Sequence, residues 1–388
     1  MTVKTWTLTD VAAGVYVDEV TLGPADMGGR APGCEVTKRT LRGGLSDGVD
    51  VIRVRTGDLT YEVLPTRGMG IWKVWLRGEE IGWQSPVRGP VHPCFVPLLE
   101  PGGLGWLDGF DELLVRCGLE SNGAPDFDAQ GRLRYPLHGR IANRPAYRVD
   151  VSIDGESGQI TVTGVVEETR FHFGKLRMTS SVTTRVGETG LSLRDEVENY
   201  SGTAAEMQLL YHINFGQPLL DPGSRFVAPV KQVMPRDPRA AEGIATWDSY
   251  APEVAGYSEQ VYFLELQADR DGRTQTLLKN ARSTRGVSLQ LNTQQLPCFT
   301  VWKNTTTSPD GYVTGLEPGT NFPNPRTHEG KQGRTVKLAP GGRTVFDLRL
   351  DVHTTAAEVA QAEAAIAVLQ AAVQPQVFDQ PQPGWCTT

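Results

Sequence analysis

The stretch YRVDVSIDGESGQITVTGVV, residues 147–166, carries the pattern that decides the fold. Apolar side chains occupy every second position on both sides of a short turn that runs from Asp154 to Gly158. They are Val149, Val151 and Ile153 before the turn, and Ile160 and Val162 after it. Alternation with a period of two is typical of a strand that buries one face, so this stretch predicts a β-hairpin.

The same alternation recurs along the chain. It surrounds a second turn at residues 187–190, and it returns in VSLQL at 287–291 and in FDLRLDV at 346–352. Strand follows strand without a helix between them, which favours antiparallel sheets packed face to face. We therefore predict an all-β fold in the form of a large antiparallel β-sandwich.

One helix is predicted, near the end of the chain. Residues 355–373 are rich in alanine, and Thr355 and Glu358 have the spacing of a capping box. Residues 374–388 form a tail rich in proline and glutamine. We therefore predict a single β-sandwich domain over residues 1–354, followed by this C-terminal helix and the tail.

Two segments lack periodicity, and we interpret them as long loops on the rim of the sandwich. One is residues 218–259, rich in Pro, Asp and Ala, and the other is residues 100–131. Irregular loops of this length on a β scaffold are usually functional or disordered. The aromatic residues Trp106 and Phe110 argue against disorder in the second segment.

The composition argues against several classes of function. The 388 residues are 39% hydrophobic and 21% charged, with a formal charge of −7, which fits a soluble globular protein. There is no basic run with interleaved aromatic residues, so nucleic acid is not expected as a partner. Neither a long apolar run nor a secretory signal is visible, and the five scattered cysteines fit reduced thiols. We expect a cytoplasmic protein without membrane contact; a homodimer stays open.

Two polar residues stand out by their place in the predicted strands. His212 lies in LLYHINFG, on the strand face opposite Leu209 and Tyr211, toward solvent or a cleft. Glu317 ends an apolar run and precedes Pro318-Gly319, which predicts a carboxylate held at a cleft where the chain turns away. On its own, His212 is more often a surface or core histidine, and the Glu317 carboxylate fits a general base, a metal ligand or an ordinary surface acid.

Three further residues have side chains suited to a sugar. Arg67 in LPTRGMGIW can hold two hydroxyls or a carboxylate with its guanidinium fork, although a surface arginine is commoner. Trp302 in FTVWKN closes a strand, where it packs in the core or stacks on the apolar face of a sugar ring. His138 in YPLHGRIANRP is followed by a glycine, which lets a ligand or backbone approach closely, although an ordinary loop histidine fits as well.

These motifs together resemble the aldose 1-epimerase (galactose mutarotase-like) superfamily. LHG with His138, YHINFG with His212, FTVWKN with Trp302 and VTGLEPGTN with Glu317 occur in that order, followed by an LAPGG turn and an alternating strand. The resemblance runs from about residue 50 to residue 353. PTRGMGIW and GGLGWLDGFDELLVRCGLESNGAP are more similar to an uncharacterised, DUF4432-like branch.

The resemblance implies a β-supersandwich with a sugar cleft on one face and no cofactor or bound metal. It gives Glu317 the role of general base, His212 that of general acid, and His138 a place near the ring oxygen. Arg67 resembles the arginine that orients the substrate. Asp248 in ATWDSY is the best match for the substrate-binding aspartate, and Trp302 is expected to contact the sugar.

Mutarotation opens a hemiacetal and closes it on the other face, so it needs one group to take a proton and one to give a proton. A glutamate and a histidine suit these roles, because their reference pKa values lie on either side of mildly acidic pH. The leading hypothesis is therefore an isomerase that interconverts sugar anomers.

Two other functions remain open at this stage. One is a keto-sugar isomerase or lyase, with or without a metal ion, and the other is a carbohydrate-binding protein without catalysis. An acid–base pair favours an enzyme, since a binder needs none. Two departures from the superfamily, the lack of a double glycine after His138 and the inserted segment 106–126, favour a specialised substrate.

Overall fold

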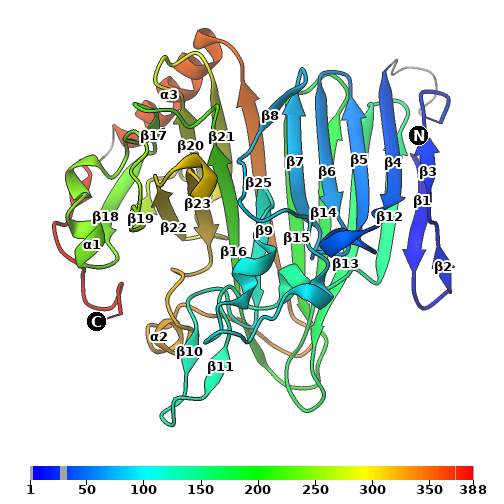
Figure 1. Cartoon of the computed structure of the whole chain (residues 1–388), viewed down its shortest axis with the longest axis horizontal. Coiled ribbons are helices and arrows are strands. Elements are labelled where there is room, and N and C mark those ends of the chain that lie inside the picture. The colour runs from blue at the N-terminus through cyan, green and yellow to red at the C-terminus, as the bar shows by residue number, and fades with distance from the viewer. Residues whose placement is uncertain (1–2, 27–32, 372, 388) are drawn as a thin grey trace.

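The computed structural model describes residues 3–26, 33–371 and 373–387. Residue 372 of the predicted helix and residue 388 of the predicted tail therefore lie outside the described residues. The described chain is dominated by antiparallel strands, which confirms the all-β prediction. Figure 1 shows two large sheets, one behind the other, with the two ends of the chain on opposite sides of the molecule.

The smaller of these two sheets contains ten strands in the described part of the chain. In order of pairing they are β17 (Arg225–Val227), β20 (Arg273–Lys279), β21 (Gly286–Asn292), β25 (Arg343–His353), β15 (Gly190–Asn199), β14 (Lys175–Arg185), β13 (Gln159–Thr169), β12 (Arg148–Asp154), β1 (Val3–Asp10) and β2 (Val15–Tyr16). The alternating segments noted in the sequence, at 147–166, around 187–190, at 287–291 and at 346–352, all fall in this sheet.

The larger sheet contains fourteen strands among the described residues. Its main path is β26 (Gln376–Val377), β18 (Val230–Pro235), β19 (Gln260–Leu266), β22 (Cys298–Asn304), β23 (Val313–Gly319), β16 (Ala205–Gly216), β9 (Leu114–Leu119), β7 (Gly70–Leu76), β6 (Leu59–Leu64), β5 (Asp50–Thr56), β4 (Cys34–Thr40) and β3 (Val20–Leu22). In addition, β24 (Val336–Leu338) pairs with β16, and β8 (Glu79–Ile81) pairs with β7.

The remaining elements are short, apart from one helix. A separate hairpin joins β10 (Asp126–Phe127) to β11 (Leu133–Tyr135). The helices are α1 (Pro238–Ala241), α2 (Arg326–Lys331) and α3 (Ala356–Gln370), and the 3-10 turns are η1 (Gly44–Ser46), η2 (Pro93–Phe95), η3 (Gly105–Gly109), η4 (Ile141–Asn143), η5 (Ile244–Thr246) and η6 (Ser308–Asp310). None of the helices that the structure describes is long and apolar enough to cross a membrane.

The predicted hairpin is present, with one face buried as predicted. In β12 and β13, Val151 pairs with Val162 and Ile153 pairs with Ile160, and these side chains point into the space between the sheets. One hydrophobic cluster fills that space with residues from both sheets. Such a shared core supports the proposal that residues 1–354 form one domain.

The C-terminal helix is confirmed, with both parts of its capping box. The Thr355 hydroxyl accepts from the Glu358 backbone N–H, and the Glu358 carboxylate accepts from the Thr355 backbone N–H. Val359, Ala362 and Ile366 pack against Leu277 of β20 on the outside of the smaller sheet. Beyond the helix the tail docks on the larger sheet, where β26 pairs with β18 and Trp385 stacks on Phe322.

The prediction of two long rim loops is wrong in part. Residues 218–259 contain β17, β18 and α1, and residues 100–131 contain β9, which lies in the middle of the larger sheet. The sequence of β9, LVRCGL, is buried at every position. A strand buried on both faces has no polar face, so it lacks the alternation that would reveal it.

Candidate active site

The central strands of the larger sheet form the floor of a cavity on its outer side, away from the smaller sheet. The cavity has a volume of about 520 Å³ and is covered by the segment around η3. This size is usual for a small-molecule site, which spans about 300–1,000 Å³. Its polar lining residues are Ser85, His138, His212, Arg236, Glu259, Asn304, Asp310 and Glu317.

His212 and Glu317 contact each other at the floor of this cavity. His212 lies on β16 and Glu317 on the neighbouring strand β23, and 3.2 Å separates His212 Nε2 from Glu317 Oε1. Both side chains are almost fully buried. His212 faces the cavity while Leu209 and Tyr211 face the core, as the strand pattern predicts. Sequence reasoning thus placed these two residues together correctly.

We predicted that the chain turns away directly after Glu317, and this prediction is wrong. β23 continues through Pro318 to Gly319, which pairs with Leu210 of β16. The pairing of the two strands lapses between Leu210 and Ile213, opposite Pro318 and Glu317. Because proline has no backbone N–H to donate, it suits a gap in the ladder. The gap lies at the side chains that form the site.

Asn214 determines which nitrogen of His212 carries a proton. Its amide nitrogen donates to the backbone carbonyl of Glu112 at 3.0 Å, so its amide oxygen faces His212 Nδ1, 2.7 Å away. An amide oxygen only accepts, and therefore Nδ1 must donate. When His212 is neutral, its Nε2 has a lone pair directed at Glu317, and only a protonated Glu317 can complete that hydrogen bond.

The surroundings of the pair favour this neutral, singly protonated form. Burial raises the pKa of Glu317 to about 8, and the nearby carboxylate of Glu259 raises it as well. Burial lowers the pKa of His212 well below its usual value, and His138 adds to this effect. The two shifts have the same physical cause, because a buried site disfavours the charged form of each group.

His138 lies beside this pair, as predicted. Its ring centre is 5.3 Å from that of His212. Its Nδ1 is 2.9 Å from the carbonyl oxygen of Asn122, so it donates there and leaves the Nε2 lone pair free. Burial lowers the pKa of His138 to about 4. The next residue, Gly139, has φ +71°, and a side chain would meet the Ser121 carbonyl at 2.0 Å, so only glycine fits there.

Aromatic side chains make up much of the cavity wall. Trp302 lies 5.4 Å from His212 between ring centres, and its indole nitrogen donates to Glu259 at 2.7 Å. Trp106 and Phe110, on and beside η3, lie 6.0 and 5.1 Å from His212. The predicted position of Trp302 beside a ligand site is consistent with this wall. Aromatic faces of this kind suit the C–H faces of a sugar ring.

Arg67 does not line the cavity, so the structure gives it a different place from the predicted substrate-orienting one. Its guanidinium is buried and donates to the Glu112 carboxylate, to Asn143 and to the backbone carbonyls of Val91 and Gly109. These contacts tie together the segments that cover the cavity. With its donors used by the protein, Arg67 acts as a structural support beneath the site.

Asp248 lies outside the cavity as well. Its carboxylate accepts from Arg225 at 2.6 Å, and the two residues line a separate surface hollow. The segment that carries Asp248 follows η5 and bonds to the edge strand β17, where the Phe226 N–H donates to the Asp248 carbonyl, and Asp248 does not line the cavity of His212 and Glu317. The expected substrate-binding aspartate is therefore not in this position.

The described residues contain no group of three or more His, Cys, Asp or Glu side chains arranged to hold a metal ion. His138, His212 and Glu317 come close together, and because His138 Nδ1 and His212 Nδ1 both donate to protein oxygens, the Nε2 atom of each ring is left as the acceptor on the cavity side.

Sequence reasoning missed Asn214, Glu112 and Glu259. Asn214 had a signal, because residues two apart on a strand lie on the same face, and Asn214 follows His212 by two. Glu112 supplies the carbonyl that orients Asn214, and Glu259 joins Trp302 to Arg236. No local pattern marks these two acids, because their partners come from distant parts of the chain.

Comparisons with solved structures define the class of this protein. A "putative aldose 1-epimerase" from Klebsiella pneumoniae superimposes with a TM-score of 0.95 at 34% identity, over 98% of this chain and 99% of that chain. A galactose mutarotase-like protein from Clostridium acetobutylicum gives 0.57 at 16% identity, over 83% and 99%. Galactose 1-epimerase from Lactobacillus acidophilus gives 0.55 at 12% identity, over 83% and 99%. The two distant matches show the fold alone.

The fold is thus that of the galactose mutarotase-like superfamily, as the sequence motifs indicated. The model of the DUF4432 family, described as a domain of unknown function, matches residues 46–352. The chain belongs to this family. The comparison with curated proteins found no match.

Proposed function

We propose that this protein is an aldose 1-epimerase-like isomerase that interconverts the anomers of a sugar through Glu317 and His212. The observation that carries the proposal is the buried contact of 3.2 Å between these two side chains on the floor of an aromatic cavity. Structural relatives named as aldose 1-epimerases support the reaction class. The free cysteines fit the cytoplasm as its location.

The pair holds the one proton that the reaction needs. One member accepts the proton of the anomeric hydroxyl while the other gives a proton to the ring oxygen, and the bond between C1 and the ring oxygen breaks. The open-chain carbonyl then rotates and closes by the reverse steps, so no proton is gained or lost. Sequence reasoning made Glu317 the base and His212 the acid. The raised pKa of Glu317 and the donating Nδ1 of His212 favour the proton on Glu317 in the free protein, so this assignment requires that proton to move to His212 first.

His138 complements the pair. Its free Nε2 is an acceptor beside His212, where it can hold a sugar hydroxyl near the ring oxygen. A protein that only binds sugar has no need of a buried acid–base pair, since burial of both groups costs stability. The pair therefore favours catalysis over binding alone.

The test is anomer exchange measured by NMR across a panel of monosaccharides. The proposal expects wild type to accelerate exchange for at least one sugar, and His212→Asn to reduce that acceleration by about 10² or more. Binding without exchange for every sugar would favour a carbohydrate-binding protein. Keto-sugar products in the same spectra would favour a keto-sugar isomerase or lyase. Loss of activity with a chelator, restored by a divalent ion, would favour metal assistance.

A further inference from the structure

We propose that the substrate is an uncharged sugar with an apolar group on the carbon next to its ring oxygen, such as the methyl group of a 6-deoxy sugar. This inference rests on the proposed function, because it places the anomeric carbon beside His212 and Glu317. It follows from the uneven distribution of hydrogen-bonding groups and charge in the cavity.

The free polar groups gather at one end of the cavity. His138 Nε2 has no hydrogen-bond partner among the described residues, and the carboxyl group of Glu317 shares its proton with His212. A hemiacetal has two oxygens on one carbon, which match this end. The rest of a hexose carries hydroxyl groups in several directions, and each needs a partner once water is removed.

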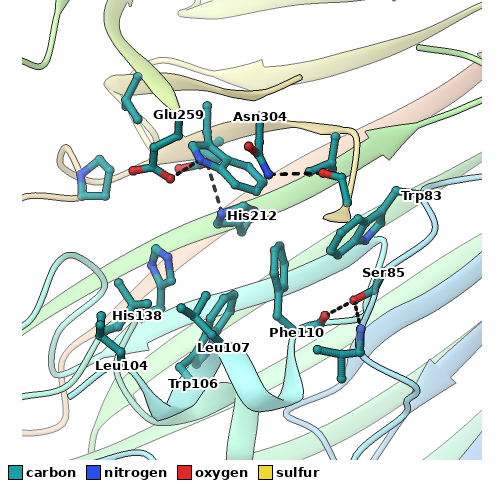
Figure 2. A pocket seen from close by; sticks show the side chains of 18 of the residues that line it. Trp83, Ser85, Leu104, Trp106, Leu107, Phe110, His138, His212, Glu259 and Asn304 are labelled. Atoms are coloured by element: carbon teal, nitrogen blue, oxygen red, sulfur yellow. Dashed lines mark hydrogen bonds and ion pairs between the residues drawn. The ribbon is translucent and has the colours of Figure 1, made fainter. Parts of the chain in front are cut away.

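Two further polar groups of the cavity have a partner within the protein. The Ser85 hydroxyl donates to the Phe110 carbonyl at 2.7 Å and accepts from the Val87 backbone N–H at 3.0 Å. One N–H of the Asn304 amide donates to the Gly311 carbonyl at 3.2 Å. Figure 2 shows these contacts along the cavity wall. A hydroxyl placed beside Ser85 competes with existing bonds, whereas a methyl group does not.

The charges of the cavity do not suit an anionic sugar. Among the described lining residues Arg236 is the only cation, and it pairs with Asp237 at 2.9 Å and with Glu259 at 3.0 Å. Asp310 and Glu317 add acidic groups to the same cavity. A phosphate or carboxylate would therefore meet carboxyl groups without a free guanidinium or ammonium to pair with.

Two leucines give the cavity an apolar side that the described residues leave partly exposed. Leu104 and Leu107 line it from the segment of η3, and they are 42% and 45% exposed. Figure 2 shows them beside Trp106 and His138, across the cavity from Glu259 and Asn304. Exposed leucines that face a cavity offer surface for an apolar group of the ligand to bury. This apolar side is where we place the methyl group.

The experiment compares matched sugars that differ by one oxygen. The pairs are D-galactose with D-fucose and L-mannose with L-rhamnose, with D-glucuronate and D-glucose 6-phosphate as anionic probes. Exchange is measured by NMR, and binding by fluorescence of the cavity tryptophans. We expect the 6-deoxy member of at least one pair to have a kcat/KM about 10-fold higher or more, and the anionic probes not to bind. Equal or higher kcat/KM for the hydroxylated member of both pairs, or tight binding of an anionic probe, would overturn the inference.

A variant of the apolar wall sharpens the test. Leu107→Asn adds a hydrogen-bonding group at the apolar side, so it is expected to reduce the preference for the 6-deoxy sugar by about 3-fold or more. Leu99→Asn is the matched control, because Leu99 is 58% exposed in the same segment and does not line the cavity. If Leu107→Asn and Leu99→Asn showed the same preference for the 6-deoxy sugar, this would contradict the assignment of the methyl group to this side.

The binding measurement separates the two proposals. If no sugar exchanges but the 6-deoxy sugars bind more tightly than their partners, the isomerase proposal fails and the inference on ligand class stands. If exchange is accelerated but the hydroxylated sugars bind and react as well or better, the isomerase proposal stands and this inference fails.

Discussion

The two large sheets of this protein differ in what covers their outer faces. In the smaller sheet, β13 and β14 alternate strictly between buried and half-exposed residues, so one face meets the core and the other meets solvent. In the larger sheet, β6, β9 and β23 are buried at every position. The smaller sheet serves to close the core, whereas the larger sheet also has a covered outer face that holds the candidate site.

The two sheets also differ in the surroundings of the polar side chains on their outer faces. On the smaller sheet, charged side chains such as Arg194 and Asp347 pair in solvent. On the larger sheet, His212 and Glu317 are removed from water and have shifted pKa values. Burial of polar groups is costly, so it is expected where chemistry requires it.

The largest effect is expected where the two sheets meet. Asp195 of β15 accepts from Arg116 of β9, with 3.1 Å between Oδ1 and Nη2, and from the Tyr211 hydroxyl at 2.8 Å. We predict that Asp195→Asn lowers the free energy of unfolding by about 3–5 kcal/mol, because it leaves the buried Arg116 guanidinium without a counter-charge.

The measurement is urea denaturation, with Asp347→Asn as the matched control. Asp347 pairs with Arg194, the neighbour of Asp195, but both partners are about half exposed. Its loss is expected to cost less than about 1 kcal/mol. If Asp195→Asn cost no more than this control, the pair between the sheets would not be a main link between them.

A smaller effect is expected from Asn214, which acts through His212. We predict that Asn214→Leu lowers kcat/KM by about 10- to 100-fold, the range found for residues that orient a functional histidine. Its direct readout is the tautomer of His212 in ¹⁵N NMR. Wild type is expected to carry the proton on Nδ1, and the variant to show both tautomers. A variant that keeps the Nδ1–H form at full activity would remove Asn214 from this role.

Several parts of the fold and of the candidate site could be predicted from the sequence. The hairpin at 147–166 and the helix after Thr355 follow from local patterns and were predicted with nearly correct bounds. His212 and Glu317 were found by motif order. Asn214 was missed, although its spacing from His212 on one strand would have indicated it.

Other features of the fold and the site depend on partners distant in the chain, which the sequence does not specify. β9 was taken for a loop, because burial on both faces removes its alternation. Arg67 was expected to hold substrate, but Glu112, 45 positions later, binds its guanidinium inside the protein. Asp248 was expected in the cleft and instead pairs with Arg225. Side-chain pairing in the folded state decided each of these outcomes.

The smallest effect is expected in the pH dependence of stability. Folding raises the pKa of Glu317 from 4.5 to about 8, so its contribution to stability is complete below pH 4.5 and is lost as pH rises through 8. A Gln side chain cannot ionise, so the variant does not lose this contribution to stability as pH rises. We therefore predict that the Tm of Glu317→Gln, relative to wild type, rises by about 2 °C or more between pH 5 and pH 9. Parallel melting curves across this range would contradict the raised pKa.

The central claim is that the buried pair of Glu317 and His212 catalyses proton transfer to and from a sugar. Its most direct test is the anomer exchange rate of Glu317→Gln, measured by NMR on the best substrate of wild type at pH 7. Gln keeps the shape of the side chain but cannot carry the shared proton. The account predicts that sugar binding, followed by tryptophan fluorescence, stays within a few-fold of wild type while the exchange rate falls by about 10² or more. An exchange rate equal to that of wild type would contradict it.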